Sequence, residues 1–99
     1  MILVVDLAAK AEMNEAALFY EESREGLGQE FLDTVELAFK QITASPLIWR
    51  KFKGRFRRYL ISRFPYAIVY AVEATSVYVA AVAHLKRKPD YWLERVQQS

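Results

Sequence analysis

Residues 66–84 read YAIVYAVEATSVYVAAVAH, and this stretch decides the fold. Its two apolar halves are rich in β-branched and aromatic residues, which favour strands, and Ala74-Thr75-Ser76 between them is typical of a turn. Together with Glu73, these residues at the middle favour a hairpin over a membrane-spanning helix. We therefore predict antiparallel strands at 66–73 and 77–84. Because both are apolar on both faces, we expect them in the centre of a sheet, with helices covering one face.

Two further segments are predicted to be strands. Residues 56–62 form a third β-branched and aromatic run, which the turn Arg63-Phe64-Pro65 separates from the hairpin. Residues 1–5 resemble the start of a secretory signal, but Asp6 interrupts the apolar run and helix-forming residues follow. We therefore interpret residues 1–5 as a first strand.

Between these strands lie two stretches with helical periodicity. In residues 8–23, apolar side chains recur at the spacing of one helix face. Gly26-Leu27-Gly28 breaks this pattern, and a second amphipathic helix follows, which Pro46 ends. The short link predicts an antiparallel helical hairpin, whose acidic side chains, Glu12 among them, we expect to be solvated on its outer surface. The apolar faces comprise Ala9, Met13, Ala16, Ala17 and Tyr20 in the first helix, and Phe31, Leu32, Val35, Ala38, Phe39 and Ile42 in the second.

Length and composition limit the architecture. The chain has 99 residues, 54% of them hydrophobic, which is enough for one packed core, so we expect a single domain over residues 1–99. The predicted class is α+β, with an N-terminal strand and a helical hairpin packed on a C-terminal antiparallel sheet, and a short helix after Pro89. The lack of cysteine fits the reducing cytoplasm.

Charge is divided unevenly along the chain. Residues 1–49 hold 3 Lys and Arg against 9 Asp and Glu, a net charge of −6, whereas residues 50–99 hold 11 against 3, a net charge of +8. Residues 50–63 contain no acid, and their cations are interleaved with Phe52, Phe56 and Tyr59. Such a segment attracts nucleic acid, on whose bases the aromatic rings would stack, or an acidic protein segment. The alternative is that the rings belong to the core and the cations protect a sheet edge.

Few residues suit the common catalytic devices. One histidine, no cysteine and no close cluster of carboxylates argue against a metal site, and the three glycines form no phosphate-binding loop. We therefore predict neither metal nor cofactor. His84, just before Lys86-Arg87-Lys88, is a candidate general base, and a structural hydrogen-bonding role is the alternative. Tyr91 and Trp92 are interpreted as packing residues of the C-terminal turn, with surface recognition as the second interpretation.

Several motifs occur together in a fixed order along most of the chain. They are Glu15-Ala16-Ala17-Leu18-Phe19-Tyr20-Glu21, Gly26-Leu27-Gly28 followed by Phe31-Leu32, Pro46 with Trp49, Arg57-Arg58-Tyr59-Leu60, Arg63-Phe64-Pro65-Tyr66-Ala67-Ile68-Val69-Tyr70, and Ala81-Val82-Ala83-His84-Leu85-Lys86-Arg87-Lys88-Pro89-Asp90-Tyr91-Trp92. In this order and spacing they resemble the toxins of the RelE/ParE superfamily, from bacterial type II toxin–antitoxin or plasmid-stabilisation modules. The resemblance implies a helical hairpin against an antiparallel sheet. It also implies a cognate antitoxin, whose C-terminal segment wraps and neutralises the toxin.

The resemblance implies one of two activities. RelE-like members cut messenger RNA on the ribosome with arginine, lysine and sometimes tyrosine, glutamate or histidine, whereas ParE-like members lack that set and are associated with inhibition of DNA gyrase. RelE-like toxins tend to place an arginine just after the aromatic residue that begins the middle strand. Here Ala67 follows Tyr66 at that place. The Phe64-Pro65-Tyr66 turn is instead closer to the ParE-like pattern. Loss of one preorganised charge donor typically costs about 10²–10³ in rate, so the missing arginine argues against efficient cleavage.

The expected function is therefore that of a ParE-like toxin, which poisons DNA gyrase or another topoisomerase by binding and without catalysis. The residues expected to bind a target or partner are Arg55, Arg57, Arg58, Arg63, Lys86, Arg87, Lys88 and Trp92. The alternative is a ribosome-dependent mRNA endoribonuclease that uses Arg58, His84, Arg87 and Tyr91. A third possibility is a toxin-like protein that only binds its partner. The sequence leaves open a homodimer or a toxin–antitoxin heterotetramer.

Overall fold

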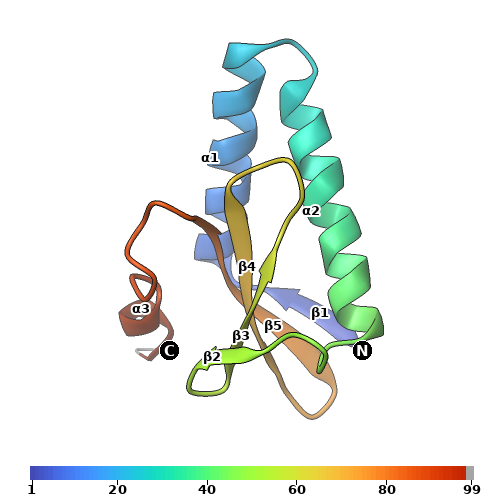
Figure 1. Ribbon diagram of the computed structural model, residues 1–99, viewed down its shortest axis with the longest axis vertical. Helices are drawn as coiled ribbons and strands as arrows, with labels where there is room; N and C mark the ends of the chain where they lie inside the picture. The colour runs from blue at the N-terminus through green and yellow to red at the C-terminus, as the bar shows by residue number, and fades with distance from the viewer. Residues whose placement is uncertain (98–99) are drawn as a thin grey trace.

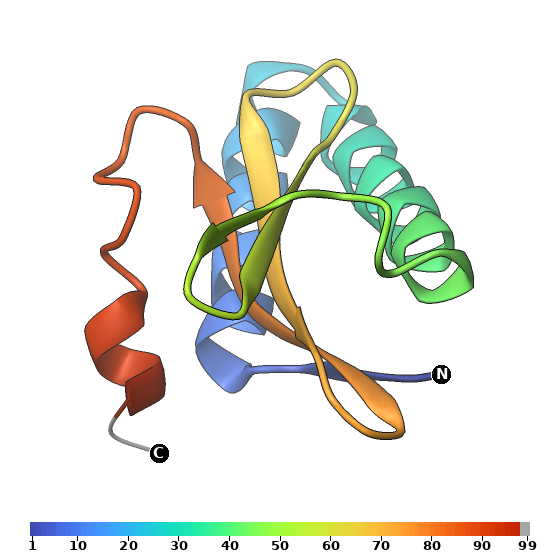
Figure 2. The ribbon, with the colours of Figure 1, turned by 60° about the horizontal axis from the view of Figure 1, so that its bottom comes forward.

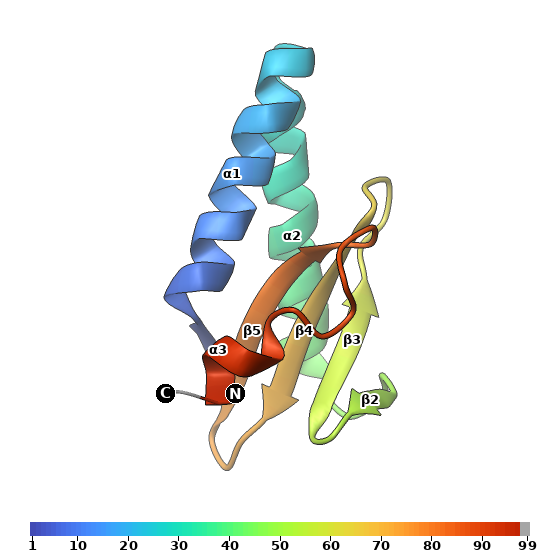
Figure 3. The same cartoon turned by 90° about the vertical axis from the view of Figure 1, so that its left-hand side faces the viewer.

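The computed structural model describes residues 1–97 as three layers. An antiparallel pair of long helices packs on one face of a five-stranded sheet, and the segment after the last strand crosses the opposite face (Figures 1 and 3). The predicted α+β class and helical hairpin are confirmed. In chain order, the elements are β1 (Ile2–Val5), α1 (Leu7–Ser23), α2 (Leu27–Ala44), β2 (Lys51–Lys53), β3 (Phe56–Leu60), β4 (Tyr66–Val72), β5 (Ser76–His84) and α3 (Leu93–Gln97).

The sheet is mixed, with the strand order β1-β5-β4-β3-β2. The predicted antiparallel strands β3, β4 and β5 are present, and β1 joins them at one edge, parallel to β5. Strand β2 was not expected, because its three residues are too few to show a period, and its register against β3 is irregular. Among residues 1–97, no helix is both long enough and apolar enough to cross a bilayer.

Strands β4 and β5 form the centre of the sheet, as their apolar faces predict, and a bulge sets their register. Val69 pairs with Ala81 but Tyr70 pairs with Val79, so Ala80 is an extra residue in β5. An extra residue reverses which side chains face each side of a strand. The helix face of the two strands therefore presents Ile68, Tyr70, Val77, Val79 and Val82, and the opposite face presents Val69, Ala71, Ala80 and Ala81.

Both helices bury the faces that periodicity predicts, and glycine determines how closely they approach. Gly26 precedes α2 with φ 87°, in the left-handed region that residues with a side chain rarely adopt. Gly28 lies in the first turn of α2, where a Cβ atom would sit 2.5 Å from the carbonyl oxygen of Ala17 on α1. The two helices therefore approach each other closely near this link.

The expectation that the acidic side chains of the hairpin are only solvated is wrong for at least three of them. Glu21 accepts hydrogen bonds from two backbone amides of the link, at 2.9 and 3.0 Å. Glu30 pairs with Arg63 and Arg24, and the hydrogen bonds from these two guanidinium groups lower its pKa. Glu12 is the third, and it faces the last part of the chain.

Residues 85–97, called here the C-terminal segment, form the third layer. After β5 the chain turns back and runs along the sheet to end near the start of α1 (Figure 2). Trp92 is fully buried, with its ring centroid 4.7 Å from that of Phe56, and its indole nitrogen donates to the Pro89 carbonyl oxygen at 2.9 Å. The short helix expected after Pro89 is α3, which begins at Leu93.

Candidate functional site

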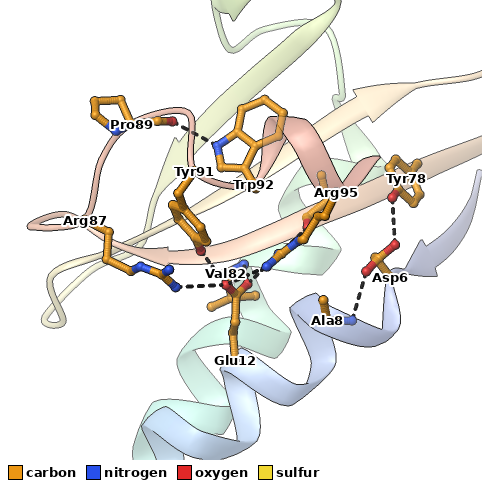
Figure 4. Close-up of polar contacts among 11 residues, drawn as sticks. Asp6, Ala8, Glu12, Tyr78, Val82, Arg87, Pro89, Tyr91, Trp92 and Arg95 are labelled. Carbon is orange, nitrogen blue, oxygen red and sulfur yellow. Dashed lines mark hydrogen bonds and ion pairs between the residues drawn. The ribbon is translucent and has the colours of Figure 1, made fainter. Parts of the chain in front are cut away.

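A carboxylate on α1 holds the C-terminal segment against the sheet. Glu12, whose side chain is 14% exposed, accepts a hydrogen bond from the backbone amide of Val82 at 3.1 Å and another from the Tyr91 hydroxyl. Arg95 donates to both carboxylate oxygens, at 3.0 and 3.1 Å, and an Arg87 nitrogen lies 3.5 Å from one of them (Figure 4). We call Glu12, Arg87, Tyr91 and Arg95 the Glu12 cluster.

Tyr91 lies at the centre of this cluster. The guanidinium carbon of Arg87 is 3.6 Å from the centroid of its ring, within the range of a cation–π contact. Burial raises the pKa of the Tyr91 phenol, and the hydrogen bond to Glu12 raises it further. The hydroxyl is therefore held as a protonated donor.

A second tyrosine makes a similar bond at the N-terminal end of α1. The Tyr78 hydroxyl on β5 donates to Asp6 at 2.8 Å, and Asp6 also accepts from the Ala8 amide at 2.9 Å as the N-cap of α1. Burial and the bond to Asp6 raise the pKa of Tyr78 to about 12. Two hydrogen bonds between a phenol and a carboxylate thus connect the beginning of α1 to β5 and to the C-terminal segment (Figure 4).

A small cationic pocket lies beside the Glu12 cluster. Arg58 of β3 lines it together with His84, Arg87 and Lys88 from the end of β5 and the turn that follows. The guanidinium carbon of Arg58 lies 5.1 Å from the Phe52 ring centroid. Three of the four alternative catalytic residues therefore meet here, and Tyr91 shares a neighbouring cavity with His84 and Arg87.

His84 is engaged on one side of its ring. The backbone amide of Lys86 donates to His84 Nδ1 at 3.0 Å, and the ring packs edge-on against Tyr66 with centroids 5.0 Å apart. An amide can only donate, so Nδ1 is the acceptor and the neutral ring carries its proton on Nε2. His84 Nδ1 therefore already has a hydrogen-bond partner within the turn, which is the kind of contact that a structural hydrogen-bonding role requires.

Three other arginines of the basic stretch lie away from this pocket. Arg57 points to the opposite face of β3 from Arg58, and Arg55 and Arg63 lie in the turns before and after that strand. Arg57 donates to the carbonyl oxygens of Leu47 and Trp49, and so holds the loop before β2. Arg55 pairs with Glu73 at 3.2 Å, and Arg63 pairs with Glu30 of α2 at 2.7 Å. The basic run is thus spread over several surfaces rather than one.

The remaining predicted binding residues divide into exposed and buried ones. Lys86 and Lys88 are exposed, and neither forms an ion pair with another described residue. Trp92 is fully buried, so it offers no surface to a partner while the C-terminal segment is docked. Its large apolar indole packs on the face of the sheet opposite the helices. Phe56 is buried beside it, as the core interpretation of these rings predicts.

Ala67 lies where an arginine would have joined the pocket. Its side chain is buried at the wall that Arg58 and His84 also line, and it pairs with Leu60 of β3. The methyl group donates nothing, so the pocket depends on Arg58, Arg87 and Lys88 for its charge.

Glu12 and Arg95 are the site residues that sequence reasoning missed. Arg95 also donates to the Ala80 carbonyl oxygen at 2.9 Å. It follows Tyr91 by four residues, which is one turn of the helix predicted after Pro89, and this spacing could have suggested a shared role. Glu12 carries no such signal among the many acids of its helix. Among residues 1–97, no group of three or more His, Asp or Glu side chains is placed to hold a metal ion.

Comparisons with known proteins agree with this architecture. Residues 3–89 match the family model of the ParE toxin of the type II toxin–antitoxin system, parDE. A solved structure described as the chromosomal ParDE TA system from P. aeruginosa is similar in fold, with a TM-score of 0.64 and 13% sequence identity over 87% of this chain and 97% of that one. No curated protein matches. Because the family model covers most of the sequence, the chain belongs to the ParE toxins of type II toxin–antitoxin systems.

Proposed function

We propose that this ParE-family toxin arrests bacterial growth by binding DNA gyrase or a related topoisomerase in the cytoplasm, without cleaving nucleic acid. The observation that carries the proposal is the hydrogen bonding of His84 and Tyr91, the two side chains that could transfer a proton in catalysis. His84 Nδ1 already accepts from the Lys86 amide, and the Tyr91 hydroxyl is bonded to Glu12 with a raised pKa. General acid–base catalysis needs a side-chain atom that is free to exchange a proton with the substrate, whereas His84 Nδ1 and the Tyr91 hydroxyl are already engaged within the protein.

The basic pocket and the turn beside it suit an acidic partner surface. Arg58, Lys86, Arg87 and Lys88 are all exposed, and they come from β3 and from the turn after β5. A cluster of one sign of charge speeds the encounter with a partner of opposite charge and fixes its orientation. We expect this surface to contact the target.

We also propose that a cognate antitoxin neutralises the toxin. An apolar groove on the helical hairpin, lined by Ala17, Leu18, Gly28 and Leu32, is suited to a partner segment that folds on binding, and the basic surface is suited to acidic residues of that segment. Light scattering of the purified complex distinguishes a toxin homodimer from a toxin–antitoxin heterotetramer.

Induced expression tests the proposal when supercoiling and translation are followed separately. The wild-type toxin is expected to arrest growth, purified toxin to inhibit gyrase supercoiling, and translated messages to stay intact. Arg87→Gln with Lys88→Gln is expected to weaken inhibition by roughly tenfold or more, since about 1.4 kcal/mol corresponds to a factor of ten. Arg55→Gln, which removes a cation outside the pocket, is the matched control. Undiminished supercoiling at a large molar excess of wild-type toxin would count against a gyrase target.

An mRNA endoribonuclease is the second candidate, because Arg58, His84 and Arg87 line one pocket. Primer extension on a translated message detects it as toxin-dependent cuts that disappear in Arg58→Ala, His84→Ala or Arg87→Ala. Such cuts would replace the binding mechanism with a catalytic one.

A further inference from the structure

We propose that Glu12, which lies in the acidic helical hairpin, is a positioning residue for the basic target surface: it fixes the Arg87 guanidinium on the Tyr91 ring, facing outward. The inference rests on the proposed function, and it assigns a role to a residue outside the basic half of the chain.

Arg95 is held by several hydrogen bonds within the protein, whereas Arg87 is more exposed to a partner. Arg95 uses both terminal nitrogens on Glu12, donates again to the Ala80 carbonyl oxygen, and its side chain is 30% exposed. Arg87 makes one longer contact to Glu12, at 3.5 Å, and its side chain is 55% exposed. A guanidinium has five N–H donors, so most donors of Arg87 remain available to a partner.

The charges of the cluster point the same way. One carboxylate faces two guanidinium groups, so it neutralises one positive charge and leaves the other. Arg95 holds the shorter, bidentate contact, which is the stronger kind. The excess positive charge therefore lies on the Arg87 side, next to Lys86 and Lys88.

Glu12 also fixes the surface on which Arg87 rests. Its carboxylate accepts the Tyr91 hydroxyl, and the Arg87 guanidinium lies 3.6 Å above the centroid of the same ring. Because Glu12 holds both the Tyr91 ring and the Arg87 guanidinium in place, less side-chain entropy is lost when a partner binds. This is how a carboxylate can strengthen a cationic surface.

The alternative is that Glu12 only stabilises the fold. The hydrogen bond between Tyr78 and Asp6 provides a matched control for that purely structural role. It too joins a tyrosine hydroxyl to a carboxylate at the start of α1, but it does not touch Arg87. We therefore compare Glu12→Gln with Tyr78→Phe, adding Arg87→Gln and the double variant Glu12→Gln/Arg87→Gln.

The first measurement is NMR of the Arg87 side chain in purified protein, which needs no target. In the wild type and in Tyr78→Phe, the Arg87 protons are expected to be shifted upfield by the Tyr91 ring, and in Glu12→Gln this shift is expected to be lost. An unchanged shift in folded Glu12→Gln overturns the inference, whether or not the toxin inhibits gyrase.

The second measurement is gyrase inhibition, corrected for the folded fraction of each variant. Glu12→Gln and Arg87→Gln are expected to weaken inhibition by similar factors of roughly tenfold, and the double variant by no more than either alone, because residues in one network are not additive. Equal inhibition by Glu12→Gln and Tyr78→Phe overturns the inference while the proposed function stands. A wild-type toxin that inhibits neither gyrase nor growth overturns the proposed function itself, and with it the target role of Glu12.

Discussion

Arg95 of α3 binds Glu12 of α1 through two hydrogen bonds, at 3.0 and 3.1 Å, although the residues are 83 positions apart in sequence. The same guanidinium donates to the Ala80 carbonyl oxygen of β5 at 2.9 Å. It therefore joins the helical hairpin, the sheet and the C-terminal segment at one point. The buried Trp92 also holds the C-terminal segment, so both polar and apolar contacts dock this segment on the sheet.

Arg95→Gln is expected to lower the free energy of unfolding by roughly 1.5–3 kcal/mol, the usual cost of losing hydrogen bonds to a charged group. The reason is that Glu12 is mostly buried and would lose its main counter-charge. Urea denaturation of the purified protein measures the change. Arg55→Gln is the control, because its ion pair with Glu73 is exposed and is expected to contribute less than about 1 kcal/mol. Equal effects of the two variants would mean that the Glu12 contact is not formed in solution.

Trp92→Ala is expected to be the most destabilising single change in the C-terminal segment, at roughly 3–5 kcal/mol. The fully buried indole packs on Phe56 and Phe52, and removing it leaves a cavity on this face of the sheet. Thermal melting gives the size of the loss, and hydrogen exchange shows whether residues 85–97 lose protection. Leu85→Ala, at a half-exposed leucine of the same segment, is expected to change stability by less than about 0.5 kcal/mol. A Trp92→Ala protein as stable as wild type would show that the segment is not docked.

The parts of the fold that the sequence predicted are those with local causes. The apolar faces of α1 and α2 follow from a period of 3.6 residues, and the central place of β4 and β5 follows from apolar side chains on both faces. The turns between them follow from short polar or proline-containing segments. Each of these features depends on neighbours within about ten residues, so a single sequence contains the information.

The parts that the sequence did not predict depend on contacts between distant residues. Nothing in the helix of Glu12 distinguishes it from Glu15 or Glu22, and only its position opposite Arg95 gives it a role. The parallel pairing of β1 with β5 has the same origin. Charge counted along the chain also does not show how the basic run is divided, because the strand places Arg57 and Arg58 on opposite faces.

Gly28→Ala is expected to separate the two long helices near their link. The new Cβ atom would lie 2.5 Å from the Ala17 carbonyl oxygen, which is backbone and cannot turn away as a side chain can. Overpacking of this kind typically costs about 1–3 kcal/mol, which exceeds the gain in helix propensity of about 1 kcal/mol from replacing glycine. Denaturant unfolding measures the difference. At the neighbouring exposed position, Gln29→Ala is the control and is expected to stay within about 0.5 kcal/mol of wild type. A stabilised Gly28→Ala protein would contradict the close helix contact.

Stability is expected to fall at alkaline pH through the two tyrosines that donate to carboxylates of α1. Burial, together with the bonds to Asp6 and Glu12, raises the pKa of Tyr78 to about 12 and also raises that of Tyr91, against 10.0 for an unperturbed phenol. Because the folded protein holds these protons more tightly than the unfolded chain, their contribution is complete below about pH 10 and is lost as the pH rises towards 12.

Urea denaturation between pH 8 and pH 12 measures this loss directly. We expect Tyr78→Phe and Tyr91→Phe each to be less stable than wild type at pH 8, where the hydroxyl bond exists, and to lose less stability than wild type as the pH rises. The two variants retain every lysine, so they separate the phenol contribution from general charge effects at high pH. If the double variant Tyr78→Phe/Tyr91→Phe loses stability as steeply as the wild type between pH 10 and pH 12, the two phenol–carboxylate bonds do not hold α1 to the rest of the protein.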